Sequence, residues 1–139
     1  MGNKIIQHIQ IRFRDIDAMG HVNNAVYFTY FEIARGRLFK DLFGWNNMTE
    51  LKDLPIIAAS NSCNYRRPLF IGTNISAECY VSKIGTKSFT ITTKIVDDDK
   101  TVYADGKSVV VFYDYKNNRS MEISKHYKEV LERFLINDE

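Results

Sequence analysis

Hydrophobic and polar residues alternate near the start of the chain and predict a strand. From Ile5 to Phe13 the apolar side chains Ile9, Ile11 and Phe13 recur at every second position, as in a strand with one buried face. The segment DAMG follows, and Gly20 can adopt backbone angles that other residues avoid. We therefore expect a strand over Ile5–Phe13 and a sharp bend directly after it.

A nearly continuous apolar segment follows the bend and predicts a helix over Asn24–Phe43. Asn23 or Asn24 suits the N-cap, because an amide oxygen can accept a hydrogen bond from a free N–H of the first turn. The first half, through Ala34, is apolar nearly all round, which is typical of a helix enclosed by protein. Gly44 suits the C-cap.

The rest of the chain, after a loop around residues 45–55, predicts strands and one more helix. An amphipathic helix is expected to start near Ser124, with Tyr127, Val130, Leu131, Phe134 and Leu135 on its apolar face. The strands are expected at Ile56–Tyr65, from Ile75 through Val81, from Phe89 through Ile95, and at Val102–Tyr115, with the turn VDDDK before the last. These elements predict an α+β fold in a single domain, residues 1–139, with a curved antiparallel sheet that wraps around the long helix and buries all its faces.

Composition narrows the class of protein. The chain has 139 residues, of which 45% are hydrophobic and 26% charged, as in a globular domain. Its formal charge is +2 with acids and bases interspersed, so we expect no nucleic-acid partner. No apolar run reaches the roughly 18 residues of a membrane span, so a cytoplasmic protein without a membrane partner is expected. Cys63 and Cys79 form no CxxC pair, which favours free thiols over a metal site.

Asp17 lies a few residues before the predicted helix. A helix N-terminus presents free backbone N–H groups and the positive end of the helix dipole, and both suit an oxygen that becomes negative during a reaction. A carboxylate facing such a site could act as nucleophile or general base in attack on a carbonyl. An Asp at this place also commonly serves only as a cap or dipole partner, and the residues alone leave both roles open.

Several segments together resemble a known enzyme family. RFRDIDAMGHVNNAVYFTYFEIAR, YRRPLFIGT, VSKIGTKSFTIT and GKSVVVFYD, in this order, resemble the hotdog-fold acyl-CoA thioesterases of the 4-hydroxybenzoyl-CoA thioesterase type, and are similar also to acyl-carrier-protein (acyl-ACP) thioesterases. The resemblance implies a curved antiparallel sheet around one long helix, and a homodimer or homotetramer with sites at the subunit interface. It also implies that Asp17 is catalytic and that a backbone N–H at Asn24 or a neighbour polarises the thioester carbonyl. The chain departs from the family pattern at Thr73 and Ser124, away from this chemistry.

Besides Asp17 and Asn24, further residues are candidates for contact with the substrate. Gly20, His21 and Asn23 belong to the bend motif and are expected to contact substrate. Arg66, Arg67, Lys83 and Lys87 could bind the phosphates of coenzyme A, since Arg supplies a planar fork of donors and Lys a point charge; a solvated surface charge is an equal alternative for each of them.

Two further carboxylates have competing interpretations. Glu32 could replace the bend Asp as the catalytic acid, although an ion pair with Arg35 three residues on is the preferred interpretation. Asp15 could pair with Asp17 in catalysis, although a strand-end charge is preferred.

The sequence as a whole favours a hydrolase that cleaves an acyl-CoA or acyl-ACP thioester and needs no metal or redox cofactor. Asp17 acts in this hypothesis as nucleophile or general base. The alternative is a non-catalytic module of the same fold that binds acyl-CoA without turnover.

Overall fold

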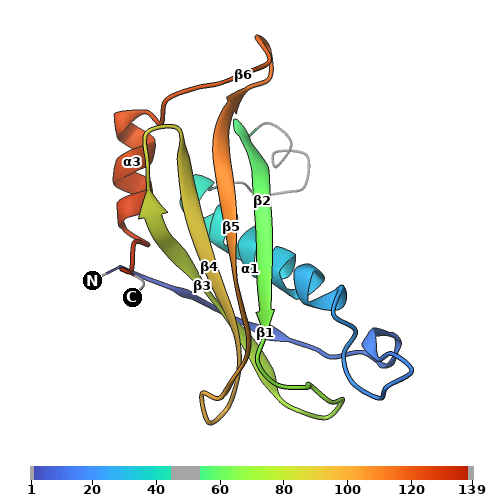
Figure 1. Cartoon of the computed structure of the whole chain (residues 1–139). Helices are drawn as coiled ribbons and strands as arrows, with labels where there is room; N and C mark the ends of the chain where they lie inside the picture. Colours follow the sequence, from blue (N-terminus) through green and yellow to red (C-terminus); the bar gives the residue numbers. More distant parts are fainter. Residues whose placement is uncertain (1, 45–53, 138–139) are drawn as a thin grey trace.

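The computed structural model describes residues 2–44 and 54–137, and its central feature is an antiparallel sheet (Figure 1). The strands lie in the order β1-β3-β4-β5-β2, and the short β6 pairs with β5. Their bounds are β1 Ile5–Ile9, β2 Ile56–Tyr65, β3 Ile75–Ile84, β4 Ser88–Asp97, β5 Val102–Asp114 and β6 Arg119–Ser120. The helices are the 3-10 turn Phe13–Asp15, the long α1 Val26–Phe43 and the short α3 Lys125–Glu132.

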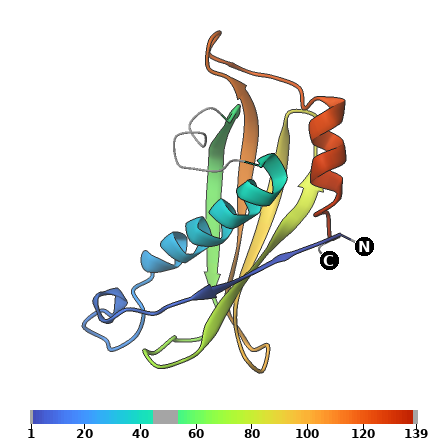
Figure 2. The same cartoon turned by 180° about the vertical axis from the view of Figure 1, so that it is seen from behind.

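Helix α1 lies across one face of the sheet (Figure 2) and forms the core with it. Alternate residues of β3 (Ala77, Cys79 and Val81) point toward the helix and are fully buried. The helix contributes Tyr30, Phe31, Ala34 and Leu38, each at most 2% exposed. The connection from β1 to β2 runs through α1, so β2 joins the far edge of the sheet and leaves β3 to pair with β1.

Phe31 approaches β5 closely because Gly106 has no side chain. A Cβ at Gly106 would overlap the Phe31 ring and the carbonyl oxygen of Ser62 on β2. Register shifts interrupt the β2–β5, β3–β4 and β4–β5 ladders, and such bulges increase the local twist of a sheet. The close approach of Phe31 to Gly106 and the added twist together let the sheet curve over one side of α1.

Most predicted elements are confirmed. Strand β2 has the predicted bounds, β3, β4 and β5 lie over the predicted segments, and Ser124 is the N-cap of α3, its hydroxyl accepting from the Tyr127 N–H at 3.2 Å. Gly20 and Gly44 have the positive φ angles of 88° and 69° that the bend and the C-cap require. The loop predicted around residues 45–55 lies mostly outside the described residues.

Three predictions about the N-terminal half are wrong. The first strand ends at Ile9, because the chain then turns into the 3-10 segment instead of continuing beside β3. Helix α1 begins at Val26 with Ala25 as its N-cap, one residue after Asn24 and two after Asn23, the predicted candidates. The sheet does not bury all faces of α1, since it covers one side and leaves Ile33 44% exposed on the other.

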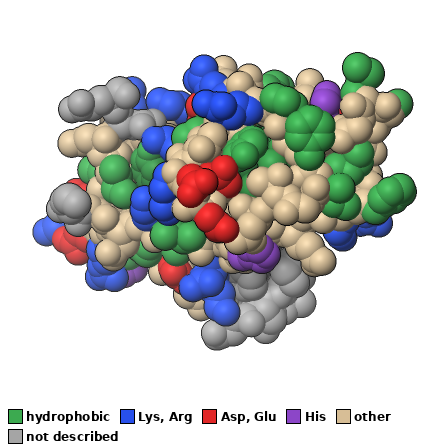
Figure 3. All heavy atoms as spheres, turned by 90° about the horizontal axis from the view of Figure 1, so that it is seen from below, with side chains coloured by type: hydrophobic (Ala, Val, Ile, Leu, Met, Phe, Trp, Pro, Cys, Tyr) green, Lys and Arg blue, Asp and Glu red, His purple; other side chains and the backbone are tan. Residues whose placement is uncertain are grey.

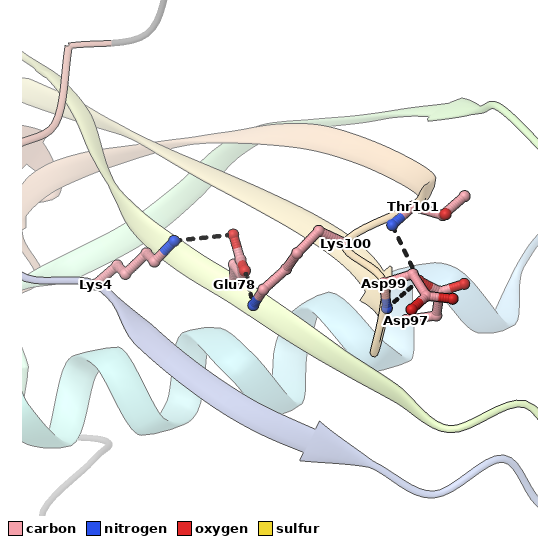
Figure 4. Close-up of polar contacts among 6 residues, drawn as sticks. All are labelled: Lys4, Glu78, Asp97, Asp99, Lys100 and Thr101. Atoms are coloured by element: carbon pink, nitrogen blue, oxygen red, sulfur yellow. Dashed lines mark hydrogen bonds and ion pairs between the residues drawn. The ribbon is translucent and has the colours of Figure 1, made fainter.

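An ion-pair cluster ties β3 to its surroundings on the side of the strand opposite the core. Glu78 is 8% exposed, and its carboxylate accepts from Lys4 and Lys100 at 3.1 Å each (Figure 4). Burial raises the pKa of Glu78, but the hydrogen bonds from Lys100 and Lys4 outweigh it and leave that pKa below its usual value. The charged form of Glu78 therefore stabilises the fold.

No helix among the described residues is both long and apolar enough to cross a membrane.

Candidate active site

The predicted bend is a tight hairpin that carries Asp17. Its ends are joined by a bridge between Ile16 and Val22, and the Asp17 N–H donates to the His21 carbonyl at 3.0 Å. The Gly20 N–H donates back to the Asp17 carbonyl at 3.0 Å. Because φ at Gly20 is positive, a residue with a side chain would strain this turn. Gly20 thus shapes the hairpin through its backbone.

The Asp17 side chain, which follows the Ile16–Val22 bridge at the base of the hairpin, is 25% exposed. Its Oδ1 accepts from the Met19 N–H at 2.9 Å, and its Oδ2 lies 3.9 Å from Nδ1 of His21. The Met19 contact fixes the carboxylate without neutralising its charge. Asp17 therefore remains accessible beside the imidazole of His21.

Helix α1 begins a few residues further along the chain. Asn23 supports this end twice, since its Oδ1 accepts from the Ala25 N–H and its carbonyl from the Val26 N–H, both at 2.9 Å. The Asn24 carbonyl accepts from the Tyr65 hydroxyl at 2.9 Å, which orients the peptide group before the helix. Among the described residues the Asn24 N–H has no acceptor. A donor at the positive end of a helix suits an oxyanion.

A pocket of about 240 Å³ opens at this helix end. It is lined by His21, Val22, Asn24, Tyr27, Tyr65, Arg66, Arg67 and Pro68. The structure thus brings His21, Asn24, Arg66 and Arg67 together from segments more than 40 positions apart. Asp17, Gly20 and Asn23 do not line this pocket, but the Asp17 carboxylate lies 3.9 Å from Nδ1 of His21, which does.

Two tyrosines close one side of the pocket. The rings of Tyr27 and Tyr65 meet edge to face, 5.1 Å between centroids, and Tyr27 is 2% exposed. Burial, aided by the neighbouring Cys63 and Tyr65, raises the pKa of Tyr27 to about 12, so its hydroxyl stays protonated. Tyr65 was not among the predicted site residues, although its position directly before Arg66 and Arg67 could have indicated that it lies at the same pocket.

The two arginines differ in their surroundings. Arg66 donates to Asp105 through Nε at 2.8 Å and Nη2 at 3.1 Å, a bidentate pair that raises the pKa of Arg66 further. Arg67 has an exposed side chain. Arg66 also borders a second pocket of about 370 Å³ on the sheet surface, where Lys94 and Lys107 add positive charge. The basic surface thus continues from the helix end onto β4 and β5.

The two competing carboxylates take different places. Asp15 is buried, 5% exposed, so its interpretation as a strand-end charge is wrong: the 3-10 turn directs its side chain inward to the hydroxyl of Tyr30. Glu32 is exposed on α1. The hydrogen bonds of Arg35 go instead to Asn61 at 3.1 Å and Ser108 at 2.8 Å, because the guanidinium turns toward the sheet. The preferred Glu32–Arg35 ion pair is therefore not formed.

A larger groove of about 780 Å³ lies between α1 and the edge strand β2. Its apolar lining includes Ile33, Phe39, Ile56, Ile57 and Val110. Ile33 and Ile57, which both line this groove, are 44% and 43% exposed.

Hydrophobic side chains also surround the bend. In Figure 3, a view onto the end of the sheet near the bend, they gather on one side of the surface, separate from a central acidic group. The large exposed hydrophobic residues of the bend and of the β2–β3 connection are Phe13, Met19, Phe70 and Ile71, 51% to 85% exposed. The pocket thus opens beside an apolar surface.

Comparison with known proteins places this architecture in a family. The sequence profile of the thioesterase-like superfamily matches residues 11–134, nearly the whole described chain. The chain belongs to this superfamily. The resemblance seen in the sequence is thereby confirmed, as are the hotdog fold and, at the level of the family, the expected class of thioester hydrolase.

Individual relatives agree with this assignment. The chain is 27% identical to the long-chain acyl-CoA thioesterase FadM of Escherichia coli, over 91% of the chain and 96% of FadM. It is 34% identical to the uncharacterized protein YsmA of Bacillus subtilis over 83 residues, 60% of the chain and 54% of YsmA. A thioesterase of Thermus thermophilus solved with coenzyme A and zinc is 25% identical with a TM-score of 0.80, covering 93% of this chain and 92% of that one.

Proposed function

We propose that this member of the superfamily hydrolyses acyl-CoA thioesters at the pocket before α1, with Asp17 as the catalytic carboxylate. The observation that carries the proposal is the hairpin that places the Asp17 carboxylate 3.9 Å from Nδ1 of His21, which lines a pocket together with Asn24 and Tyr27 at the start of α1. The Asp17 carboxylate activates water or itself attacks the thioester carbonyl carbon, and the N-terminal end of α1 supplies N–H donors for the carbonyl oxygen, which becomes negative during the reaction.

Two routes fit this geometry. As general base, Asp17 takes a proton from water while the water oxygen adds to the carbonyl carbon; the C–S bond then breaks and the thiolate leaves. As nucleophile, a carboxylate oxygen displaces the thiolate, and water hydrolyses the resulting anhydride. In both routes the thioester carbonyl oxygen points toward Asn24 and the start of α1. The products are a carboxylic acid and a thiol.

Basic residues favour coenzyme A as the carrier. Arg67 is exposed at the pocket, and Arg66 keeps further N–H donors free of its pair with Asp105. Lys94 and Lys107 continue this positive surface. Replacing Arg66 and Arg67 by Ala should raise KM for an acyl-CoA and leave KM for the matching N-acetylcysteamine thioester, which has no phosphate, unchanged. An equal change for both substrates would place the phosphates elsewhere.

A panel assay tests the function itself. Thiol release should be steady and catalytic for at least one acyl-CoA among short, long and aryl chains, and slower for the same acyl group on carrier protein. Calorimetric binding of the same acyl-CoAs without thiol release would instead support the alternative, a non-catalytic binding module. FadM is a long-chain acyl-CoA thioesterase, so long chains are the first to test.

We propose also that the protein is a homodimer through β2, or a homotetramer of such dimers. Within the described part of the chain β2 is an edge strand of the sheet; it is ten residues long and mostly exposed, and an edge of this length is a ready template for a second strand. The apolar groove beside β2, with Ile33 and Ile57, would be covered by the same contact.

Sedimentation tests the dimer. Ile57→Glu should shift the assembly toward monomers, because it places a charge in the buried contact. Ile6→Glu is the matched control, since Ile6 is 55% exposed on β1 at the opposite edge. A wild type that sediments as a monomer at micromolar concentration would contradict the proposal.

A further inference from the structure

The buried carboxylate of Asp15 lies at the base of the hairpin that carries Asp17. Asp15 and Glu78 are the carboxylates that are buried among the described residues, and Glu78 is neutralised by two lysines. Asp15 has a different surrounding: its Oδ2 accepts from the Tyr30 hydroxyl at 2.7 Å and from the Arg12 N–H at 2.9 Å. An ionised group in the protein interior is costly unless such donors hold it.

This contact joins two parts of the proposed site. Tyr30 lies in α1, four residues after Val26, and is 1% exposed. The carbonyl of Asp15 accepts from the Asn23 N–H at 2.9 Å, and Asn23 in turn supports the first residues of α1. One residue thus holds the hairpin base through its backbone and the body of the helix through its side chain.

Tyr30 is suited to be a permanent donor. Burial, followed by the hydrogen bond to Asp15, raises the pKa of the Tyr30 hydroxyl well above its ordinary value, so the proton stays on the phenol oxygen. The ring is packed in the core, next to Tyr27 at 6.2 Å between centroids. A rigid donor on a helix fixes its acceptor more accurately than a flexible surface group.

We propose that Asp15 and Tyr30 are positioning residues, which set the place of the Asp17 carboxylate relative to the N-terminus of α1. The inference rests on the proposed function. Asp17 lies two residues after Asp15, and the hairpin that begins at Ile16 has no other side-chain hydrogen bond to α1 among the described residues. We call the hydrogen bond between the Tyr30 hydroxyl and the Asp15 carboxylate the clamp. Without the clamp the hairpin keeps its own turn and the hydrogen bond from the Val22 N–H to the Leu69 carbonyl at 2.8 Å, but its orientation relative to α1 becomes less fixed. A misplacement of about 1 Å can cost about a hundredfold in rate.

Tyr30→Phe tests the clamp, because it removes one oxygen atom and keeps the ring. Its kcat for an acyl-CoA should fall at least about tenfold, while KM changes by less than about twofold because the pocket lining is intact. Tyr103→Phe is the matched control: it removes a Tyr hydroxyl that donates to Asp97 at 3.0 Å in the β4–β5 hairpin, and should keep kcat.

Three further measurements separate positioning from stability. Val130→Ala, a core truncation in α3, should lower Tm without lowering kcat of the folded enzyme. The double variant Asp15→Asn, Tyr30→Phe should be no slower than the slower single variant, because the two residues act through one contact. Amide exchange at Arg12 and Asn23, whose backbone N–H groups donate to Asp15, should be faster in Tyr30→Phe than in wild type.

Wild-type kcat in Tyr30→Phe, additive losses in the double variant or unchanged amide exchange at Arg12 and Asn23 would overturn the proposal. A wild type that hydrolyses no thioester is a different failure. It would remove the proposed function, and leave the contact as a purely structural one.

Discussion

Replacement of Asp17 by Asn separates catalysis from local structure more cleanly than any other substitution in this chain. Asn keeps the shape and the Oδ1 acceptor, so the 2.9 Å contact with the Met19 N–H can persist. What is lost is the charge. Because the side chain is 25% exposed and His21 is 3.9 Å away, the lost interaction is that of a partly exposed pair, about 0 to 1 kcal/mol. Tm should therefore fall by no more than a few degrees.

The effect on turnover should be far larger. Loss of a general base typically costs about a hundredfold or more, which is about 2.7 kcal/mol in activation free energy, and loss of a nucleophile costs more. Substrate binding should survive, because Asn24 and the other pocket residues remain. Steady-state kinetics, calorimetric binding of an acyl-CoA and thermal melting on the same variant measure the three quantities.

Asp41→Asn is the matched control for this experiment. Asp41 is a partly exposed carboxylate 3.6 Å from Arg37 at the other end of α1, and its replacement should cost similar stability and no activity. Near-normal turnover in Asp17→Asn would refute the assignment. Glu32→Gln would then be the next variant to test, since Glu32 is an exposed carboxylate on α1.

Three further predictions concern the fold. Glu78→Gln should lower the free energy of unfolding by about 1 kcal/mol at pH 7. Since the pKa of Glu78 in the folded state lies below its usual value of 4.5, this difference should shrink as pH falls below 4.5 and through the folded pKa, which urea titrations at pH 7 and at a series of lower pH values would show. Gly106→Ala should destabilise by about 1 to 3 kcal/mol, because its methyl group meets the Phe31 ring; an unchanged urea midpoint would contradict this. Ser124→Ala should lower the free energy of unfolding by about 1 kcal/mol, because α3 loses its N-cap hydrogen bond, and should leave kcat unchanged. An unaltered Tm would show that this cap does not stabilise the fold.

The sequence by itself determined most of the helices and strands. Strand alternation depends on successive residues, so the buried face of β3 follows from the pattern alone, and the break before Pro68 indicated where the strand Ile56–Tyr65 ends. The same holds for Gly20 and Gly44, where a positive φ is a property of one residue in a local turn. The family motif added the expectation that Asp17 and Asn24 belong to one site.

The tertiary structure decided which polar groups meet and which apolar groups stay exposed. Arg66 is 39 positions from Asp105, and Arg35 is 73 from Ser108, so no local pattern could pair them. The sequence suggested a fully enclosed helix, but only the extent of the sheet shows that Ile33 remains open. The same reason explains Asp15, which looked like a surface charge in its own segment. Its direction depends on a turn that brings it to Tyr30, and burial of a carboxylate is decided by the donors that fold around it.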